Sequence, residues 1–335
     1  MYEDSQRDMK PYKFAPYLRT TIWGGYQIAP FKGIFTAQPN IGESWEISAV
    51  PGHESVAVER GIIGDVDLGL NLAQLIDKYK DLLVGERVYK KYGNTFPLLV
   101  KFIDSRQDLS VQVHPNDKLA QKRHGCPGKT EMWYVVKADV GAKIYSGLKE
   151  SITPEDYERL ATTITNNQSP MTNPFMDVIA THEAHQGDLF FLPAGRLHAI
   201  GAGNFLVEIQ ETSDITYRVY DFGRKDANGK PRELHIEQAK EAIDYQVWPE
   251  YRTSYDSTKP NSELIHCPYF TVNRVVVQVA AEVDLHTDSF VVVVCLWGEA
   301  NINGIRVKQG ETLLVPASEN VLYIFGNATF LTATM

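Results

Sequence analysis

Three polar side chains able to bind a metal or a substrate recur on one face of a short predicted strand, Ser110-Val111-Gln112-Val113-His114. Strand alternation places Ser110, Gln112 and His114 on one face and the two valines on the other. Burying a hydroxyl, an amide and an imidazole together costs free energy unless these groups find polar partners. A bound metal ion would be such a partner, so the pattern predicts a metal site at this strand.

Two residues further along the chain are candidates for the remaining ligands. Glu131 lies where a turn enters a β-prone segment, and His198 follows a glycine turn, an apolar strand and a Pro-Ala-Gly corner. Together with Gln112 and His114 they form a mixed oxygen and nitrogen set, which suits Zn²⁺ best, with Fe²⁺, Mn²⁺ and Co²⁺ as further candidates. The set contains no cysteine, which argues against a purely structural zinc.

The elements that must position these residues are mostly short strands. Strands are predicted at 42–48, 96–104, 108–114, 131–136, 205–210 and 214–220, with helices at 70–92 and 233–245 and a tight turn at Trp23-Gly24-Gly25. Lys101 lies inside the buried strand 96–104, so it pairs with an acid, extends its ammonium to solvent, or binds an anion. The segment from Pro115 to Thr130 is expected to be a polar loop. His182-Glu183-Ala184-His185 is expected to be a surface turn, because the metalloprotease motif needs two histidines four residues apart on a helix and these are three apart.

Composition and charge exclude several classes of protein. The chain has 335 residues, 43% of them hydrophobic, and a net charge of −9, which gives no electrostatic support for binding nucleic acid or an anionic membrane. Cys126, Cys267 and Cys295 are widely spaced, which favours reduced thiols and a cytoplasmic setting. We expect a monomer or weak homo-oligomer with two domains, a catalytic domain at 1–248 and a C-terminal β domain at 249–335 without a metal site.

An internal repeat supports that division. Gly310 to Ala317 reproduces the pattern of Gly187 to Ala194, a glycine, an acid, an apolar run and then Pro-Ala. The position equivalent to His198 in the second copy is Val321, and no Gln-x-His precedes it. The repeat therefore indicates that one β-unit was used twice, and that the second copy has a structural role only.

The sequence resembles a known family. Short strands, glycine turns and the histidine pattern are similar to the cupin double-sheet jelly roll, a mainly β fold. Within it the chain resembles the type I mannose-6-phosphate isomerases in their short bacterial form. The motifs that carry this resemblance are Trp23-Gly24-Gly25, Gly42-Glu43-Ser44-Trp45-Glu46, Ser110-Val111-Gln112-Val113-His114-Pro115, Lys129-Thr130-Glu131-Met132, Pro193-Ala194-Gly195 with His198, and Gly310-Glu311.

The resemblance implies a reaction and roles for residues. It implies that Gln112, His114, Glu131 and His198 bind Zn²⁺ and that the enzyme interconverts mannose 6-phosphate and fructose 6-phosphate through a cis-enediol. It further implies that Lys129, Glu208 and Arg218 are catalytic and that Lys101 and Ser110 contact the substrate. We expect Lys129, beside a metal and Arg218, to titrate low, as a proton shuttle requires.

Other readings of the same residues stay open. Lys129 could be a solvated loop lysine, and Arg218 could pair structurally with Asp221 or Glu208. At the level of function, a cupin isomerase acting on another sugar phosphate, such as glucose 6-phosphate, shares the fold, metal and reaction type. A non-enzymatic sugar-binding cupin would need neither Lys129 nor Arg218. An iron dioxygenase usually has three histidine ligands, which this set lacks.

Overall fold

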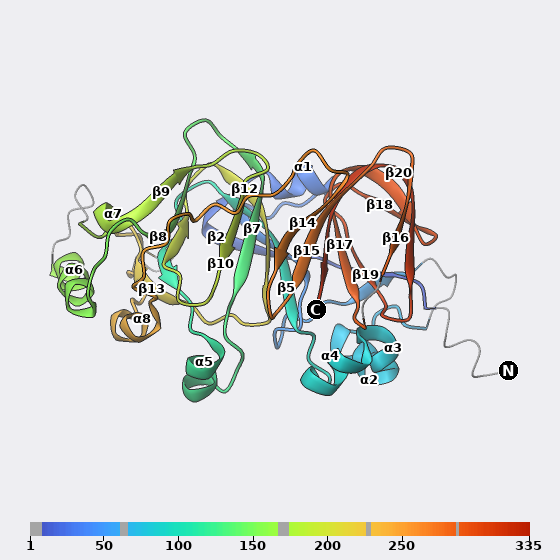
Figure 1. Cartoon of the computed structure of the whole chain (residues 1–335), viewed down its shortest axis with the longest axis horizontal. Helices are drawn as coiled ribbons and strands as arrows, with labels where there is room; N and C mark the ends of the chain where they lie inside the picture. Colours follow the sequence, from blue (N-terminus) through green and yellow to red (C-terminus); the bar gives the residue numbers. More distant parts are fainter. Residues whose placement is uncertain (1–8, 61–65, 167–173, 226–228, 286–287) are drawn as a thin grey trace.

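Antiparallel β-sheets make up most of the molecule, as the sequence predicts. The computed structural model describes residues 9–60, 66–166, 174–225, 229–285 and 288–335. Its strands form three sheets that lie in two β-rich halves side by side, with short helices below them and at one end (Figure 1). Among the described residues, no helix is long and apolar enough to cross a membrane.

Two sheets built from the first two thirds of the chain pack face to face. The six-stranded sheet has the order β10-β7-β12-β5-β2-β3, and the five-stranded sheet has the order β13-β6-β11-β8-β9. Strands β5 and β12 are buried along their whole length, which explains their near-continuous apolar sequence. The strands are β2 (Tyr17–Gly25), β3 (Ile41–Ile47), β5 (Leu98–Ser105), β6 (Val111–Val113), β7 (Glu131–Ala138), β8 (Lys143–Leu148), β9 (Ile179–Glu183), β10 (Leu189–Leu192), β11 (His198–Ile200), β12 (Asn204–Glu211) and β13 (Tyr217–Tyr220).

The third sheet combines the C-terminal strands with two strands from the N-terminal region. Its main path is β14-β15-β20-β17-β19-β1-β4, with β16 on β20 and β18 on β17. Its strands are β1 (Tyr12–Phe14), β4 (Ala57–Glu59), β14 (Asn261–His266), β15 (Thr271–Val277), β16 (Ala280–Asp284), β17 (Val291–Ile302), β18 (Ile305–Lys308), β19 (Thr312–Val315) and β20 (Val321–Thr334). The predicted domain boundary after residue 248 falls between α8 and β14 and stays a prediction.

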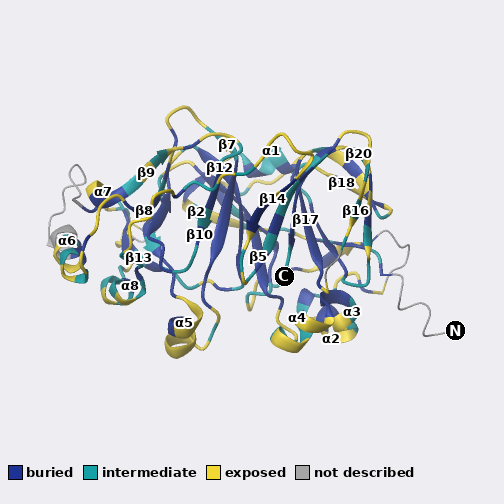
Figure 2. Ribbon diagram, viewed as in Figure 1, coloured by how far each residue is buried: buried dark blue, intermediate teal, exposed yellow. Residues whose placement is uncertain are grey.

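The helices are short and each exposes one side to solvent (Figure 2). They are α1 (Ile28–Lys32), α2 (Leu72–Tyr79), α3 (Asp81–Val84), α4 (Glu86–Tyr92), α5 (Asp117–His124), α6 (Pro154–Asn166), α7 (Pro174–Val178) and α8 (Ile236–Ala242). The single helix predicted over 70–92 is wrong, because the chain breaks into α2, α3 and α4. Lys80 and Gly85 have positive φ angles of 51° and 91° at the two breaks. A Cβ on Gly85 would lie 2.4 Å from the carbonyl oxygen of Asp288, so that glycine allows a close approach of distant backbone.

Several further sequence expectations need correction. Trp23-Gly24-Gly25 ends strand β2 instead of forming a turn, and its glycines are needed because a Cβ on Gly24 or Gly25 would lie 2.2 Å from Asn40 or Asp104. The loop expected at 115–130 contains helix α5, whose N-terminus is capped by the Asn116 side chain. The strand expected at 108–114 and the helix expected at 233–245 are shorter, as β6 and α8. His182 lies in β9, and His185 is exposed in the turn that follows.

A buried ion pair joins the six-stranded sheet to the C-terminal sheet. The ammonium of Lys32, at the end of α1, lies 2.7 Å from the carboxylate of Glu46 in β3, and both side chains are about 5% exposed or less. Lys32 also donates to the carbonyl of Gly310, and the Thr312 hydroxyl lies 3.4 Å from Glu46. The two charges therefore neutralise each other at the point where α1, β3 and the segment from Gly310 to Thr312 meet.

We predict that Glu46→Leu lowers the free energy of unfolding by about 3–5 kcal/mol, because it leaves the Lys32 ammonium buried without its partner. Urea unfolding followed by circular dichroism measures the loss. Glu299→Gln is the matched control, since it removes an acid from an exposed pair with Arg306 and should change stability by about 0.5 kcal/mol or less. Equal small losses in the two variants would show that the buried pair does not stabilise the fold.

Candidate metal centre and active cleft

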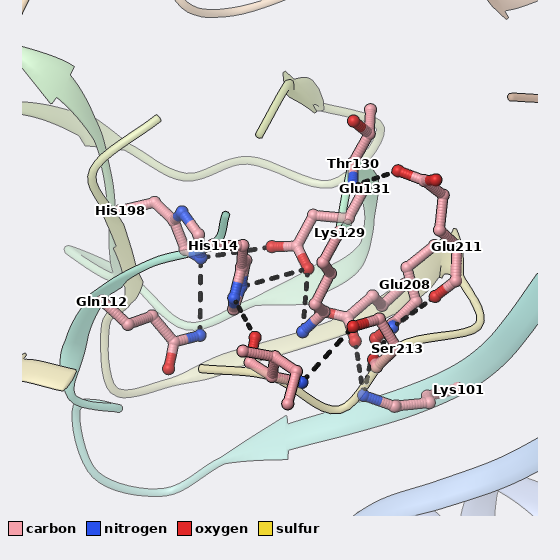
Figure 3. Close-up of polar contacts among 12 residues, drawn as sticks. Lys101, Gln112, His114, Lys129, Thr130, Glu131, His198, Glu208, Glu211 and Ser213 are labelled. Atoms are coloured by element: carbon pink, nitrogen blue, oxygen red, sulfur yellow. Dashed lines mark hydrogen bonds and ion pairs between the residues drawn. The ribbon is translucent and has the colours of Figure 1, made fainter. Parts of the chain in front are cut away.

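The two packed sheets each contribute residues to one buried polar site. His114 follows β6 and His198 begins β11, both in the five-stranded sheet, while Glu131 begins β7 in the six-stranded sheet. All three side chains are at most 1% exposed. The three therefore meet between the sheets, with Lys129, Lys101 and Glu208 beside them (Figure 3).

The two imidazoles turn their unprotonated nitrogens toward Glu131. His114 Nδ1 lies 2.9 Å from the carbonyl oxygen of Ile215, and His198 Nδ1 lies 2.7 Å from that of Arg196. A carbonyl can only accept, so each Nδ1 carries the hydrogen and each Nε2 presents a lone pair. His114 Nε2 is 3.6 Å from Glu131 Oε2, and His198 Nε2 is 3.2 Å from Glu131 Oε1.

These atoms are suited to a divalent cation. Four acceptor atoms face one another, and His114 Nε2 and both oxygens of Glu131 are buried without a hydrogen-bond partner of proper geometry. The ligand atoms of His114, Glu131 and His198 all lie within 4.8 Å of one another. Buried acceptors without donors are costly, and a metal ion would satisfy all of them. The triad could therefore hold a metal ion through two nitrogens and a carboxylate.

Gln112 lies beside the triad because of strand register. Its Cα pairs with His198 of β11 on one side and with Arg218 of β13 on the other. The Gln112 amide nitrogen is 3.4 Å from His198 Nε2. Since the oxygen and nitrogen of an amide exchange places on a half turn, the same side chain can present its oxygen to the site. The hydroxyl of Ser110, two residues earlier on the same strand face, lies 3.5 Å from the side-chain oxygen of Gln112.

A second polar cluster adjoins the triad. Lys101 in β5 and Trp133 in β7 are the cross-strand neighbours of Glu208 in β12. Glu208 accepts from the Lys101 ammonium at 2.8 Å and from the Trp133 indole at 2.9 Å, and Lys101 also donates to Gln210 at 2.8 Å. Lys101 therefore pairs with an acid, Glu208, which is one of the environments predicted for it. The Lys129 ammonium lies 3.1 Å from Glu131 and is buried, so Lys129 is not a solvated loop residue.

Burial and neighbouring charges shift the ionisation of this cluster. Burial lowers the pKa of His114 well below its usual range and that of His198 to about 3, which keeps both rings neutral. Burial raises the pKa of Glu131 to about 7 despite Lys129. For Glu208, burial is outweighed by Lys101 and Lys129, which lower the pKa to about 2.

The pKa values of Lys129 and Arg218 shift in opposite directions. Burial opposes the charge on Lys129, but Glu131 and Glu208 outweigh it, so the surrounding protein groups alone raise the pKa of Lys129; the low pKa expected beside a metal stays a prediction. Burial and the neighbouring Arg232 lower the pKa of Arg218. Arg218 donates to the carbonyl of Glu233. Asp221 binds Arg224 and Arg232 instead, so the predicted structural pairs of Arg218 do not form.

A cleft of about 450 Å³ opens beside the triad. Every non-ligand site residue predicted from sequence lines it, namely Lys101, Ser110, Lys129, Glu208 and Arg218, and Gln112 lies there too. The cleft also contains residues to which the sequence analysis assigns no role: Arg19, Glu43, Asp214, Arg232 and His235. Glu43 accepts a hydrogen bond from the Trp45 indole and pairs with Arg19.

Backbone contacts hold the Lys-x-Glu segment in place. Thr130 donates its backbone N–H to the Glu211 carboxylate at 2.7 Å, and Glu211 donates its own N–H to the Thr130 carbonyl at 3.1 Å. Thr130 thereby fixes Lys129 and Glu131 on either side of it. Chemically, the site combines a metal triad, buried acidic and basic groups and a cationic cleft, which suits polarisation of a small oxygen-rich substrate.

The chain is similar to known proteins over most of its length. Residues 12–168 match the family model of the phosphomannose isomerase type I catalytic domain. The chain is 34% identical to mannose-6-phosphate isomerase ManA of Bacillus subtilis over 92% of this chain and 93% of the relative. It is 33% identical to mannose-6-phosphate isomerase of Streptococcus mutans over 88% of this chain and 89% of the relative.

A solved structure extends the likeness to the fold. The crystal structure of mannose 6-phosphate isomerase from Bacillus subtilis matches with a TM-score of 0.84 and 27% identity, covering 97% of this chain and 100% of that one. The cupin-type fold expected from the sequence is thus confirmed. Because the identity extends over almost the whole length of both chains, this chain belongs to the type I mannose-6-phosphate isomerase family.

Proposed function

We propose that this protein is a metal-dependent isomerase that interconverts mannose 6-phosphate and fructose 6-phosphate. The observation that carries the proposal is the buried His114, Glu131 and His198 triad at the side of a cleft lined by cations. The curated relatives that match over nearly the whole chain bear that activity in their names.

The reaction moves one proton from C2 to C1 and a second from the oxygen of C2 to the oxygen of C1. A base removes the proton from C2 of the open-chain aldose, negative charge develops on the oxygens of a cis-enediol, and a proton returns at C1. Such a reaction requires stabilisation of the developing charge, groups that accept and donate protons, and contacts that hold the phosphorylated sugar.

We assign the metal as Zn²⁺, one per chain, with Gln112 as a fourth ligand beside His114, Glu131 and His198. The donor set of two imidazoles, a carboxylate and an amide supports zinc, and Fe²⁺, Mn²⁺ and Co²⁺ accept the same ligands. When bound, the cation would polarise the sugar oxygens and stabilise negative charge on them.

Three side chains of the cleft are proposed to act on the reacting atoms. Arg218 is partly buried and reaches the cleft without a carboxylate partner within 4.0 Å in the described part of the chain, so its charge is available to a developing oxyanion. Lys129 is a buried ammonium that can donate a proton or a hydrogen bond to a sugar oxygen. Glu208 is a buried carboxylate that can accept one.

Two further side chains are proposed to hold the substrate. Lys101 uses two of its donors on Glu208 and Gln210, which fixes its ammonium at the wall of the cleft. Ser110 lies on the same strand face as Gln112 and His114 and presents a hydroxyl to the cleft. We also place the enzyme in the cytoplasm on the basis of its three free cysteines, and a monomer or weak homo-oligomer stays a prediction.

We predict that purified protein isomerises mannose 6-phosphate, loses this activity on chelation, and regains it when Zn²⁺ is added back. A coupled assay for fructose 6-phosphate measures the turnover, with glucose 6-phosphate as the comparison substrate. Equal or faster turnover of glucose 6-phosphate would assign another substrate. Folded, metal-loaded protein without activity on either sugar would contradict the proposed function.

We predict that His198→Ala loses bound metal and at least about 100-fold in kcat/KM, since even residues that only support metal ligands cost up to about that much. Metal content is measured by mass spectrometry after dialysis, and circular dichroism checks the fold. His185→Ala is the matched control, because that imidazole is exposed in a turn. A variant that keeps full metal and normal turnover would exclude His198 as a ligand.

We predict that Arg218→Ala keeps its metal and loses about 100- to 1000-fold in kcat, as expected when one group that stabilises an oxyanion is removed. Steady-state kinetics separates this loss from a change in KM. Arg306→Ala, which removes an exposed guanidinium outside the cleft, should leave both constants unchanged. A near-normal kcat in Arg218→Ala would rule out the catalytic role.

A further inference from the structure

A second and larger cleft lies between the two β-rich halves. It measures about 930 Å³ and is lined by residues of α1, β7 and β12 on one side and of β15, β17 and β20 on the other. None of its lining residues lines the catalytic cleft. Its size lies within the range of about 300–1000 Å³ typical of small-molecule sites.

The charge of this cleft is opposite to that of the chain as a whole. Lys137 and Arg274 line it, and no acidic side chain does, although the net charge of the protein is −9. Within the described ranges, neither cation has a carboxylate partner within 4.0 Å; Lys137 donates to Gln27 and Arg274 to the carbonyl of Ser257. Two cations in a cleft whose lining has no acidic side chain favour an anionic ligand.

Residues behind the cleft fix the position of Lys137. Asp104, which is 2% exposed, accepts from both the backbone N–H and the side-chain amide of Gln27. These two bonds turn the amide oxygen of Gln27 toward Lys137, which donates to it at 2.9 Å. The ammonium is thereby held at the wall of the cleft, and its remaining N–H donors are available to a ligand.

An exposed aromatic surface accompanies the cations. Trp297 is 55% exposed and Tyr26 is 60% exposed, and both line the cleft. Trp297 follows six buried residues in β17, and the pairing of β17 with β20 shifts register between Cys295 and Trp297. A β-bulge of this kind redirects a side chain, so the indole is turned outward where the strand pattern would otherwise continue in the core.

We propose that this cleft binds a nucleoside phosphate, with the base stacked on Trp297 and the phosphates held by Lys137 and Arg274. Bases stack on aromatic side chains whatever their identity, and guanidinium and ammonium groups bind phosphate oxygens. Lys137 belongs to the six-stranded sheet and Arg274 to the C-terminal sheet, so phosphates between them would contact both halves. The site has no glycine-rich phosphate loop and holds its ligand through side chains alone.

Calorimetric titration of the metal-loaded enzyme with ADP tests this site. We expect saturable binding, weakened about tenfold or more in the double variant Lys137→Met, Arg274→Met, since each charged contact contributes on that scale. Trp297→Ala should weaken ADP binding as well. Lys143→Met and Phe325→Ala are the matched controls, because these exposed side chains lie outside the cleft. All variants should retain isomerase activity, which shows that they fold.

Three outcomes would overturn the proposal. Absence of saturable binding of ADP, GDP, CDP and UDP excludes a nucleoside phosphate. Displacement of ADP by mannose 6-phosphate, or loss of its binding in Arg218→Ala, places the ligand in the catalytic cleft instead. Pyrophosphate that binds as tightly as ADP, with no effect of Trp297→Ala, shows an anion site without stacking of a base.

Discussion

The buried carboxylate of Glu131 is the constraint on which the rest of the structure depends. Its oxygens face two imidazole lone pairs, and among the described residues the Lys129 ammonium is the one lysine or arginine charge within 4.0 Å of them. Such a cluster of acceptors is costly in a protein interior unless a cation joins it. Because His114 and His198 come from one sheet and Glu131 from the other, a cation that satisfied these groups would also link the two faces of the sandwich.

Much of this site follows from strand alternation in the sequence. Gln112 and His114 share a face because they are two residues apart, and Val111 and Val113 on the other face are fully buried. The cross-strand register then adds what alternation alone cannot give, by setting His198 and Arg218 on either side of Gln112. Register depends on turns and bulges far from the motif, so sequence indicated which residues take part but not which of them are neighbours.

The residues that the sequence did not reveal come from segments far from the histidine motif along the chain. Arg19 and His235 reach the catalytic cleft from opposite regions of the chain, and no spacing relates them to the histidine motif. The broken helix at 72–92 has a similar cause. Helical spacing continues across Gly85, yet the carboxylate of Asp288, about 200 residues away, accepts from the backbone of Glu86 and Arg87 and starts a new helix there. Tertiary contacts overrode a valid local pattern in this region.

The two clefts show why net charge says little about local binding. In the catalytic cleft Lys101, Lys129 and Arg232 each have a carboxylate partner, so their charges serve first to hold Glu208, Glu131 and Asp221 in position. A substrate anion must therefore compete for them, whereas Arg218 is available without that competition. In the second cleft neither cation has such a partner within the described residues. An anion there would compete with water and with the neutral oxygens of Gln27 and Ser257 but would break no ion pair within 4.0 Å, which is the cheaper exchange.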